Sequence, residues 1–250
     1  MILEDELVIL AGATGSVGGA VLGTLLAQGA HVLVVSRRAA SAEGVIAAAT
    51  DGRPELAERC AAFEADLLDA AAGEAVALRA RERLGRIDAV VSLAGGPTRF
   101  MPILESTVAD LEVNVRNFLL LTYNLVVPAL RAMLAQPFRS GKRSRGRLIV
   151  VTAGSSLDPQ PRFGLMGAAK AGVNTLMLAI AREHKADGIV ANALVLGGVA
   201  TERARDYLGA DDFAAAATPQ EVADALVFLA SDASSGVNGA LVHLNAREVD

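Results

Sequence analysis

The sequence predicts an α/β fold, a doubly wound parallel sheet of seven strands flanked by helices. Three observations predict it. The chain has 250 residues, 52% of them hydrophobic, which suits a single well-buried domain spanning residues 1–250. Short runs rich in Val, Ile and Leu alternate with longer segments of helical periodicity, the pattern of repeated βαβ units. A glycine-rich turn follows the first apolar run.

The elements are expected in strict alternation. The strands are expected at residues 7–12, 31–36, 60–66, 87–95, 146–154, 188–196 and 239–244. The helices are expected near residues 17–28, 54–59, 69–84, 107–134, 163–185 and 219–230. The last helix opens with Thr218 as N-cap and Glu221 three residues later, a capping-box pattern. Residues 196–217 are the longest segment expected to be irregular, and such loops often carry function.

Composition excludes several classes of partner. The net charge of −5 gives no general attraction to nucleic acid or anionic lipid. No uninterrupted apolar run reaches the roughly 18 residues of a membrane helix. The acidic stretch at residues 4–6 argues against a signal peptide, and Cys60, the single cysteine, cannot form an intramolecular disulfide. A cytosolic protein without nucleic-acid or membrane partners is expected.

Two further features favour structural interpretations. The run from Arg139 to Arg147 has five basic residues and could contact phosphate, but its position between a helical and a strand pattern favours a solvated connecting loop. Cys60 and the three histidines are scattered without metal-ligand spacing, so no metal site is expected.

The first turn between a strand and a helix is the most informative stretch. It places Gly12, Gly15 and Gly18 between an apolar strand and a helix. Glycines permit a tight turn and let backbone N–H groups reach a pyrophosphate at the positive end of the helix. A plain structural turn is the alternative. At the first strand of a seven-strand alternation, the pattern favours a dinucleotide site of Rossmann type.

Motifs along the whole chain resemble those of short-chain dehydrogenases/reductases. They are the glycine turn, "EADLLD" from Glu64, "SLAG" from Ser92, Asn114 with Val115, Lys170, "NALVLGGVAT" from Asn192 and the segment from Glu221 to Leu244. Ser16 stands where the main branch of the family has its middle glycine, so this spacing resembles the extended and atypical branches.

The resemblance implies a route for the cofactor. Gly12, Gly18 and the amide of Val17 would hold the pyrophosphate, with Gly15 and Ser16 in the same turn. Asp66 would accept from the adenine amino group beside Leu67, or it could simply cap the next helix. Ala94 and Gly95 would line the adenosine ribose. Val199 and Thr201 would meet the carboxamide, and the neighbouring Gly197 could also be a turn residue.

The end of the second strand bears on the choice of cofactor. An acidic residue there binds both ribose hydroxyls and repels a 2′-phosphate. This chain has Ser36 followed by Arg37 and Arg38, which suit a phosphate through charge-assisted hydrogen bonds. NADP(H) is therefore expected over NAD(H), unless the two arginines are only solvated.

The catalytic positions depart from the family pattern. The main branch pairs a tyrosine with a lysine four residues later, assisted by a serine about thirteen residues before the tyrosine. Here Met166 and Ala153 stand at the tyrosine and serine positions, while Lys170 and Asn114 remain. Lys170 would bind the nicotinamide ribose, and Asn114 would hold a water that relays protons or would satisfy backbone groups of its helix.

A second alignment and several proton donors stay open. Divergent enoyl reductases have a tyrosine seven residues before the lysine, where this chain has Phe163. Ser155, Ser156, Tyr207 in a lid-like loop, or water could supply the proton. Tyr123 lies in an apolar helical run and is expected to pack in the core.

Two functions follow from these patterns. The first is an NADP(H)-dependent oxidoreductase with a non-standard proton path, acting on a small carbonyl or enoyl compound. The second is a catalytically inactive NADP(H)-binding homologue with a regulatory or scaffold role. The resemblance also implies a homo-oligomer, most simply a tetramer built through the two longest helices and the last strand.

Overall fold

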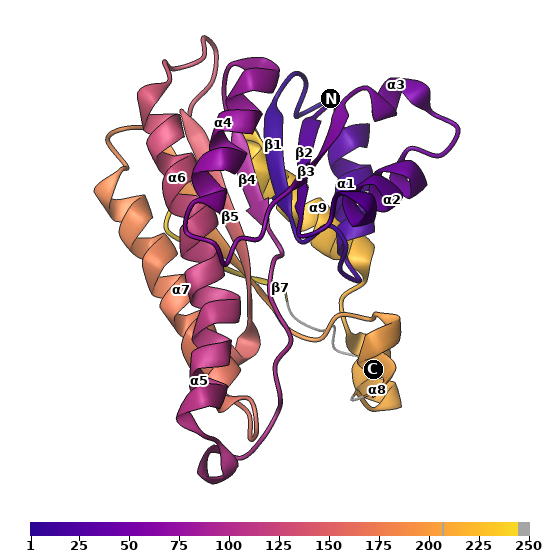
Figure 1. The fold of residues 1–250 in the computed structure, drawn as a ribbon, viewed down its shortest axis with the longest axis vertical. Helices are drawn as coiled ribbons and strands as arrows, with labels where there is room; N and C mark the ends of the chain where they lie inside the picture. Colours follow the sequence, from indigo (N-terminus) through magenta and orange to yellow (C-terminus); the bar gives the residue numbers. More distant parts are fainter. Residues whose placement is uncertain (207, 245–250) are drawn as a thin grey trace.

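The computed structural model describes residues 1–206 and 208–244. Seven parallel strands form one sheet in the order β3-β2-β1-β4-β5-β6-β7, with helices on both faces (Figure 1). The predicted doubly wound parallel sheet is confirmed. The strands are β1 (Leu7–Ala11), β2 (His31–Ser36), β3 (Cys60–Glu64), β4 (Ala89–Ser92), β5 (Gly146–Ala153), β6 (Ile189–Leu196) and β7 (Leu241–Leu244).

The helices form a layer on each face of the sheet. One layer contains α1 (Gly18–Ala27), α2 (Ala39–Ala49) and α9 (Pro219–Ala230). The opposite layer contains α4 (Ala72–Leu84), α6 (Leu121–Ala135) and α7 (Gly164–Glu183). Shorter elements are α3 (Pro54–Ala57), α5 (Val108–Asn114), α8 (Ala210–Ala215) and a 3₁₀ turn, η3 (Gly154–Ser156), directly after β5.

Side-chain alternation along the strands builds a core on each face. In β1, Leu7 and Ile9 belong to the core under α4, α6 and α7, whereas Val8 and Leu10 belong to the core under α1 and α9. All four are fully buried, because a strand covered on both faces has no polar side.

The chain winds outward in both directions from β1 and β4, which are neighbours in the sheet. This reversal opens a crevice at the carboxyl ends of the strands, the usual ligand position in such sheets.

Two helices were missed by the sequence reasoning. Residues 39–49 form α2, and Ala210–Ala215 form α8 inside the segment expected to be irregular. Helix α2 is rich in alanine and fully buries only Ala42, so it shows no clear apolar stripe. The expected helix at 54–59 is only the short α3.

The long helix expected at 107–134 is continuous but not uniform. Between α5 and α6 the backbone widens into a π-helical segment, η2 (Val115–Leu120), immediately after Asn114. Segments of this kind occur frequently at functional sites. The widening changes which side chains face α7.

Two helical stretches, Val108–Ala135 and Gly164–Glu183, are long and apolar enough to cross a membrane by length and composition. The search for an uninterrupted apolar run missed them. Both contribute to the buried core on one face of the sheet, and core helices pass the same test. They are weak evidence for a membrane span.

The basic run from Arg139 to Arg147 was expected to be a solvated loop. That expectation is wrong at the C-terminal end of the run. Arg147 lies in β5 with its side chain only 3% exposed, and it forms ion pairs with Glu6, at 3.3 Å, and with Asp232. Lys142 also pairs with Glu6, and the Arg143 amide donates to Asp232. Lys142 and Arg147 thus serve as partners of the buried Glu6 carboxylate.

Candidate functional site

The turn between β1 and α1 is a close-packed backbone cradle. Gly12 has a positive φ of +88°, and a Cβ there would lie 2.7 Å from the amide nitrogen of Ala94. A Cβ on Gly18 would lie 2.1 Å from the carbonyl oxygen of Ala13. Gly15 N donates to Gly12 O and Gly18 N to Gly15 O, at 3.1 and 3.0 Å. The turn thus points the N-terminus of α1 at the carboxyl edge of the sheet.

A hollow of about 740 Å³ opens between this turn and α2. Gly15, Ser16 and Arg38 line it, while Val17 precedes α1. The guanidinium groups of Arg37 and Arg38 have no hydrogen-bond or ion-pair partner among the described residues. The hollow can therefore offer the Ser16 hydroxyl and the free Arg38 cation to an anionic group.

A carboxylate that the sequence reasoning missed lies at the same place. Ser36 is paired in the sheet with Glu64, the last residue of β3. The Glu64 carboxylate accepts from the amide of Ala39, the first residue of α2, at 2.8 Å. The signal was available in part, since Glu64 lies near the end of the third expected strand, residues 60–66. Glu64 thus adds negative charge at the N-terminus of α2.

The loop after β3 has its own anchors. The Asp66 carboxylate accepts from the Leu68 amide at 3.1 Å, which makes a local turn rather than a cap of α4. The carbonyl of Leu67, a buried residue, accepts from Nδ2 of Asn124 in α6 at 2.9 Å. Asn124 is a positioning residue that sequence reasoning did not find, because its partner is 57 residues away.

The residues after β4 lie between the glycine turn and η2. Ala94 contacts the turn at Gly12, and a Cβ on Gly95 would lie 2.9 Å from the Phe118 ring. A side chain on Gly95 or Gly96 would push the segment after β4 away from the long helix.

The segment after β6 is held by backbone pairing. Gly197 N donates to Leu244 O at 3.1 Å, and Val199 forms a bridge with Ala217. The Thr201 hydroxyl accepts from the Ala204 amide at 3.3 Å. Gly197, Val199 and Thr201 therefore lie together beyond the carboxyl end of β6, where the carboxamide residues were expected.

Lys170 is the central cation of the site. It lies on α7, partly buried, with its ammonium 5.2 Å from the centroid of the Phe118 ring. Desolvation by burial lowers the pKa of Lys170 from 10.5 to about 8. Lys170 makes no hydrogen bond or ion pair within the described chain. Met166 precedes it by one helical turn, and Ala153 ends β5.

Asn114 is buried at the end of α5 with its amide engaged. Its Oδ1 accepts from the Thr98 hydroxyl at 2.7 Å, and its Nδ2 donates to the Asp110 carbonyl at 2.8 Å. One N–H of this amide remains available to a water or ligand. Phe118 follows four residues later on the same continuous helix, and its ring lies near the Lys170 ammonium.

The candidate proton donors differ in their surroundings. Ser156 Oγ donates to the Ala153 carbonyl at 2.6 Å and accepts from Asn174 at 2.8 Å, whereas Ser155 Oγ is buried without a partner among the described residues. Tyr207 lies outside the described residues. Tyr123 is 48% exposed on α6, so its expected core packing is wrong, because this side of α6 faces outward.

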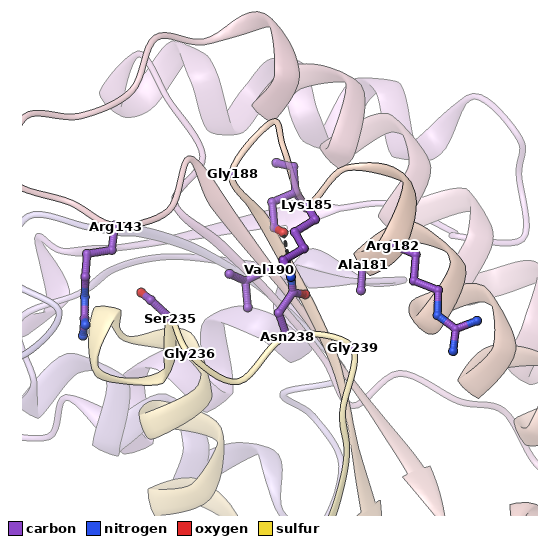
Figure 2. Close-up of a pocket in the computed structure, with 11 residues that line it drawn as sticks. Arg143, Ala181, Arg182, Lys185, Gly188, Val190, Ser235, Gly236, Asn238 and Gly239 are labelled. Atoms are coloured by element: carbon purple, nitrogen blue, oxygen red, sulfur yellow. Dashed lines mark hydrogen bonds between the residues drawn. The ribbon is translucent and has the colours of Figure 1, made fainter.

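A second hollow of about 470 Å³ lies at the amino ends of β5 and β6, at the opposite edge of the sheet (Figure 2). Arg143 and Arg182 stand at opposite sides of it, with Lys185 between them. The guanidinium of Arg143 already donates to the Asp232 carbonyl at 3.0 Å. These cations do not converge on one ligand position.

Comparison with known proteins identifies the family. Residues 6–210 match the model described as short chain dehydrogenase. The chain belongs to this family. The 3-oxoacyl-[acyl-carrier-protein] reductase FabG of Escherichia coli is 28% identical to this chain over 98% of each. The alignment with this reductase thus covers nearly the whole length of both chains.

Solved structures of the family share the fold. A short-chain type dehydrogenase/reductase from Mycobacterium ulcerans superposes with a TM-score of 0.87 at 21% identity, covering 100% of this chain and 94% of that one. ElxO with NADP bound superposes with a TM-score of 0.85 at 21% identity, over 96% of this chain and 97% of that one. At this identity, the likeness establishes the architecture alone.

Proposed function

We propose that this protein is an NADP(H)-dependent oxidoreductase that reduces a small carbonyl or enoyl compound without a tyrosine acid. The observation that carries the proposal is Lys170, a partly buried cation with no hydrogen-bonding partner among the described residues. An ammonium without a partner costs folding free energy, so its presence indicates a ligand. The ribose hydroxyls of a nicotinamide cofactor are such a ligand.

The residues at the carboxyl edge fit NADP(H). Gly12 and Gly18 allow a tight turn in which a Cβ would clash with neighbouring backbone, and the N-terminus of α1 that follows this turn favours a pyrophosphate. Ser36, Arg37 and Arg38 suit the 2′-phosphate, with Asp66 and Leu67 at the adenine and Ala94 and Gly95 at the ribose. Gly197, Val199 and Thr201 remain for the carboxamide. The cofactor bound by ElxO and the reductase activity in the name of FabG support the same assignment.

Bound NADPH would supply a hydride. Lys170 holds the ribose hydroxyls and supplies positive charge beside the reacting carbonyl. Asn114 offers its remaining N–H to a water next to Lys170. Conjugate reduction of an enoyl compound is easier here than ketone reduction, because an enolate needs a proton less urgently than an alkoxide.

The second candidate function is an NADP(H)-binding protein without redox turnover, with a regulatory or scaffold role. Met166 and Ala153 favour it, since neither side chain can donate a proton or polarise a carbonyl. In that case Lys170 serves cofactor binding only.

Restoring the family's tyrosine and serine at positions 166 and 153 distinguishes the two candidate functions. Met166→Tyr with Ala153→Ser places a phenol one turn before Lys170 and should restore acid catalysis, typically worth about 10²–10⁴-fold. NADPH oxidation with a ketone panel should then appear or rise. If the unmodified protein already reduces enoyl compounds, that activity should persist without the repair and fall in Lys170→Ala at saturating NADPH.

The non-catalytic function predicts a different pattern. NADPH binds, but neither the unmodified nor the repaired protein oxidises it with any carbonyl or enoyl compound, and a cofactor-bound structure shows side chains filling the space beside nicotinamide C4. Absence of NADPH binding in a fluorescence titration would contradict both functions.

Three further features belong to this proposal. The chain acts as one domain over residues 1–250, in the cytosol. It assembles as a homo-oligomer, and a tetramer is the simplest form. Apolar side chains exposed along α5, η2 and α6 support an assembly through the long helices: Val108, Leu111, Val115, Leu120 and Tyr123.

A further inference from the structure

The hollow at the amino edge of the sheet has no part in the proposed function. Its walls are the C-terminal turn of α7, the start of β6 and the segment of residues 235–239 before β7 (Figure 2). Its volume of about 470 Å³ lies within the usual range of small-molecule sites, roughly 300–1,000 Å³. The glycine turn lies at the opposite edge of the sheet, so a ligand in this hollow would be separate from the cofactor.

The wall formed by residues 235–239 is fixed by hydrogen bonds to β6. The Asn238 side chain accepts from the Ala191 amide at 3.0 Å and donates to the Ile189 carbonyl at 3.1 Å. The Gly239 amide donates to the Ala191 carbonyl at 3.0 Å. Because these bonds hold the segment in place, the hollow is formed before any ligand arrives, as is usual for small-molecule sites.

The carboxylates near the hollow already have partners. Asp232 accepts from the Arg143 amide at 3.1 Å and forms an ion pair with Arg147. The Asp187 carboxylate lies 2.9 Å from Nδ1 of His184. None of the described residues that line the hollow is acidic. The lining therefore carries positive charge that these carboxylates do not neutralise.

Two cations of the lining have no partner in the described part of the chain. Arg182 and Lys185 form no hydrogen bond or ion pair there. The Arg143 guanidinium donates to the Asp232 carbonyl at 3.0 Å and keeps further N–H groups. The amide of Gly236, which also lines the hollow, donates to no described residue. Arginine, lysine and backbone N–H groups are the donors that phosphate oxygens bind.

The three cations are spread along the hollow. Arg143 and Arg182 stand at opposite sides of it, with Lys185 between them (Figure 2). A compact anion such as orthophosphate is matched to one of these positions. An anion that carries its charges along a chain can contact several of them, and each charge-assisted hydrogen bond adds to its affinity. The arrangement therefore favours linked phosphates over a single phosphate.

We propose that this hollow is a second ligand site, which binds a chain of linked phosphate groups such as a triphosphate. Arg182 and Lys185 supply the free cations, and Arg143 and the Gly236 amide contribute further donors. Free polyphosphate and the triphosphate of a nucleotide share this chemistry. The inference does not rest on the proposed function, because the hollow shares no residue with the proposed cofactor site.

Isothermal titration calorimetry of the unmodified protein with tripolyphosphate tests the site. Tripolyphosphate should bind, and orthophosphate should bind about tenfold more weakly because it meets fewer cations. Arg182→Gln with Lys185→Gln should weaken tripolyphosphate binding by about tenfold or more. Both side chains are exposed, so the double variant should keep its fold, which thermal unfolding checks. Lys185→Gln alone replaces the double variant if that variant does not fold.

Two controls separate this site from general electrostatic attraction and from the cofactor edge. Arg81→Gln with Arg116→Gln removes two exposed cations, of α4 and η2, that do not line the hollow. Tripolyphosphate binding should weaken by less than about threefold. Arg38→Gln removes a cation at the opposite edge and should have a similarly small effect. A loss in either control as large as that in the Arg182 and Lys185 double variant overturns the inference.

GTP as a second probe distinguishes the two sources of phosphate. If GTP binds more tightly than tripolyphosphate and the double variant loses this affinity, the ligand is a nucleotide. Equal or weaker binding of GTP indicates free polyphosphate. If the unmodified protein binds neither probe at millimolar concentration, or if the double variant binds both as tightly as the unmodified protein does, the inference is wrong. These titrations use neither NADPH nor activity, so their failure leaves the proposed function intact.

Discussion

Charged residues at the ends of β2 and β3 oppose one another at the adenosine end of the site. In the proposed function Arg37 and Arg38 attract the 2′-phosphate, while Glu64 holds a carboxylate at the N-terminus of α2. A helix N-terminus stabilises either anion. The affinity for a 2′-phosphate therefore depends on two cations and on a carboxylate that competes with it.

Glu64→Gln should strengthen NADPH binding. The new amide keeps an oxygen that accepts from the Ala39 amide but removes the negative charge, so phosphate binding gains by roughly 0.5–1 kcal/mol. Fluorescence titrations of the variant and the unmodified protein with NADPH and NADH measure it. NADH affinity is the control and should barely change. Arg37→Ala should act in the opposite direction on NADPH, and equal affinities of the unmodified protein for the two cofactors would contradict the assignment.

Lys170 makes the stability of the free protein depend on pH. Its folded pKa of about 8 lies below the unfolded value of 10.5, so the unfolded state binds more protons between these pH values. The free energy of unfolding contributed by Lys170 is lowest below pH 8 and rises above it. Burial raises the pKa of Cys60 from 9.0 to about 11, which has the opposite effect above pH 9. Between pH 8 and 9, the change of unfolding free energy with pH therefore reports on Lys170 rather than on Cys60.

The prediction is a rise in unfolding free energy of about 1 kcal/mol between pH 8 and 9, relative to Lys170→Met. Urea unfolding of both proteins at several pH values measures the difference. Parallel pH profiles of the two proteins would show that Lys170 is not desolvated.

At the scale of elements, the β1–α1 turn and the η3–α7 contact position the site. Both depend on residues without a side chain at close approaches, Gly18 against Ala13 and Gly167 against Ser155. Such contacts let a helix end approach the strand that precedes it. They also make these positions intolerant of a Cβ.

Gly18→Ala should lower the unfolding free energy by about 1–3 kcal/mol and weaken NADPH binding, because its Cβ would overlap the Ala13 carbonyl and open the turn. Gly23→Ala is the matched control in the same helix, where a Cβ would meet nothing within 4 Å. That change should stabilise the protein by about 0.5–1 kcal/mol. Thermal unfolding with and without NADPH checks both, and equal effects of the two changes would sink the packing argument.

At the scale of the whole molecule, an ionic cluster joins segments far apart in the sequence. Arg147 of β5 links Glu6, before β1, to Asp232, after α9. It lies at the edge of the sheet opposite the candidate site. Arg147 thus holds the segments before β1 and after α9 against the amino end of β5.

Arg147→Leu should cost about 3–5 kcal/mol, because it leaves the Glu6 carboxylate buried with fewer partners. Arg131→Leu is the control, since its ion pair with Glu74 is exposed and should contribute at most about 1 kcal/mol. Urea unfolding distinguishes them. A similar loss in the two variants would show that burial does not govern these pairs.

Assembly into an oligomer is a second property of the whole molecule. A homo-oligomer through the long helices should dissociate when Val108, 73% exposed, is replaced by glutamate together with Leu111. Light scattering at micromolar concentration measures the mass. An unmodified protein that is already monomeric would contradict the proposed assembly.

The sequence by itself determined the sheet, the glycine turn and the family, because strand periodicity, glycine spacing and short motifs are local in the chain. It also predicted the role of Lys170 and departures from the family pattern at Met166 and Ala153. It missed α2, since an alanine-rich exposed helix has little periodicity. It misread the basic run, because buried ion pairs form between residues that are more than 80 positions apart.

Only the tertiary structure brought Glu64 to the N-terminus of α2 and left the Ser155 hydroxyl buried without a partner among the described residues. The sequence had left Ser155 and Ser156 as equal candidates. Their difference depends on which hydroxyl α7 reaches when it packs on η3. Whether a polar group is satisfied is a property of its folded surroundings, and no local pattern of residues encodes it.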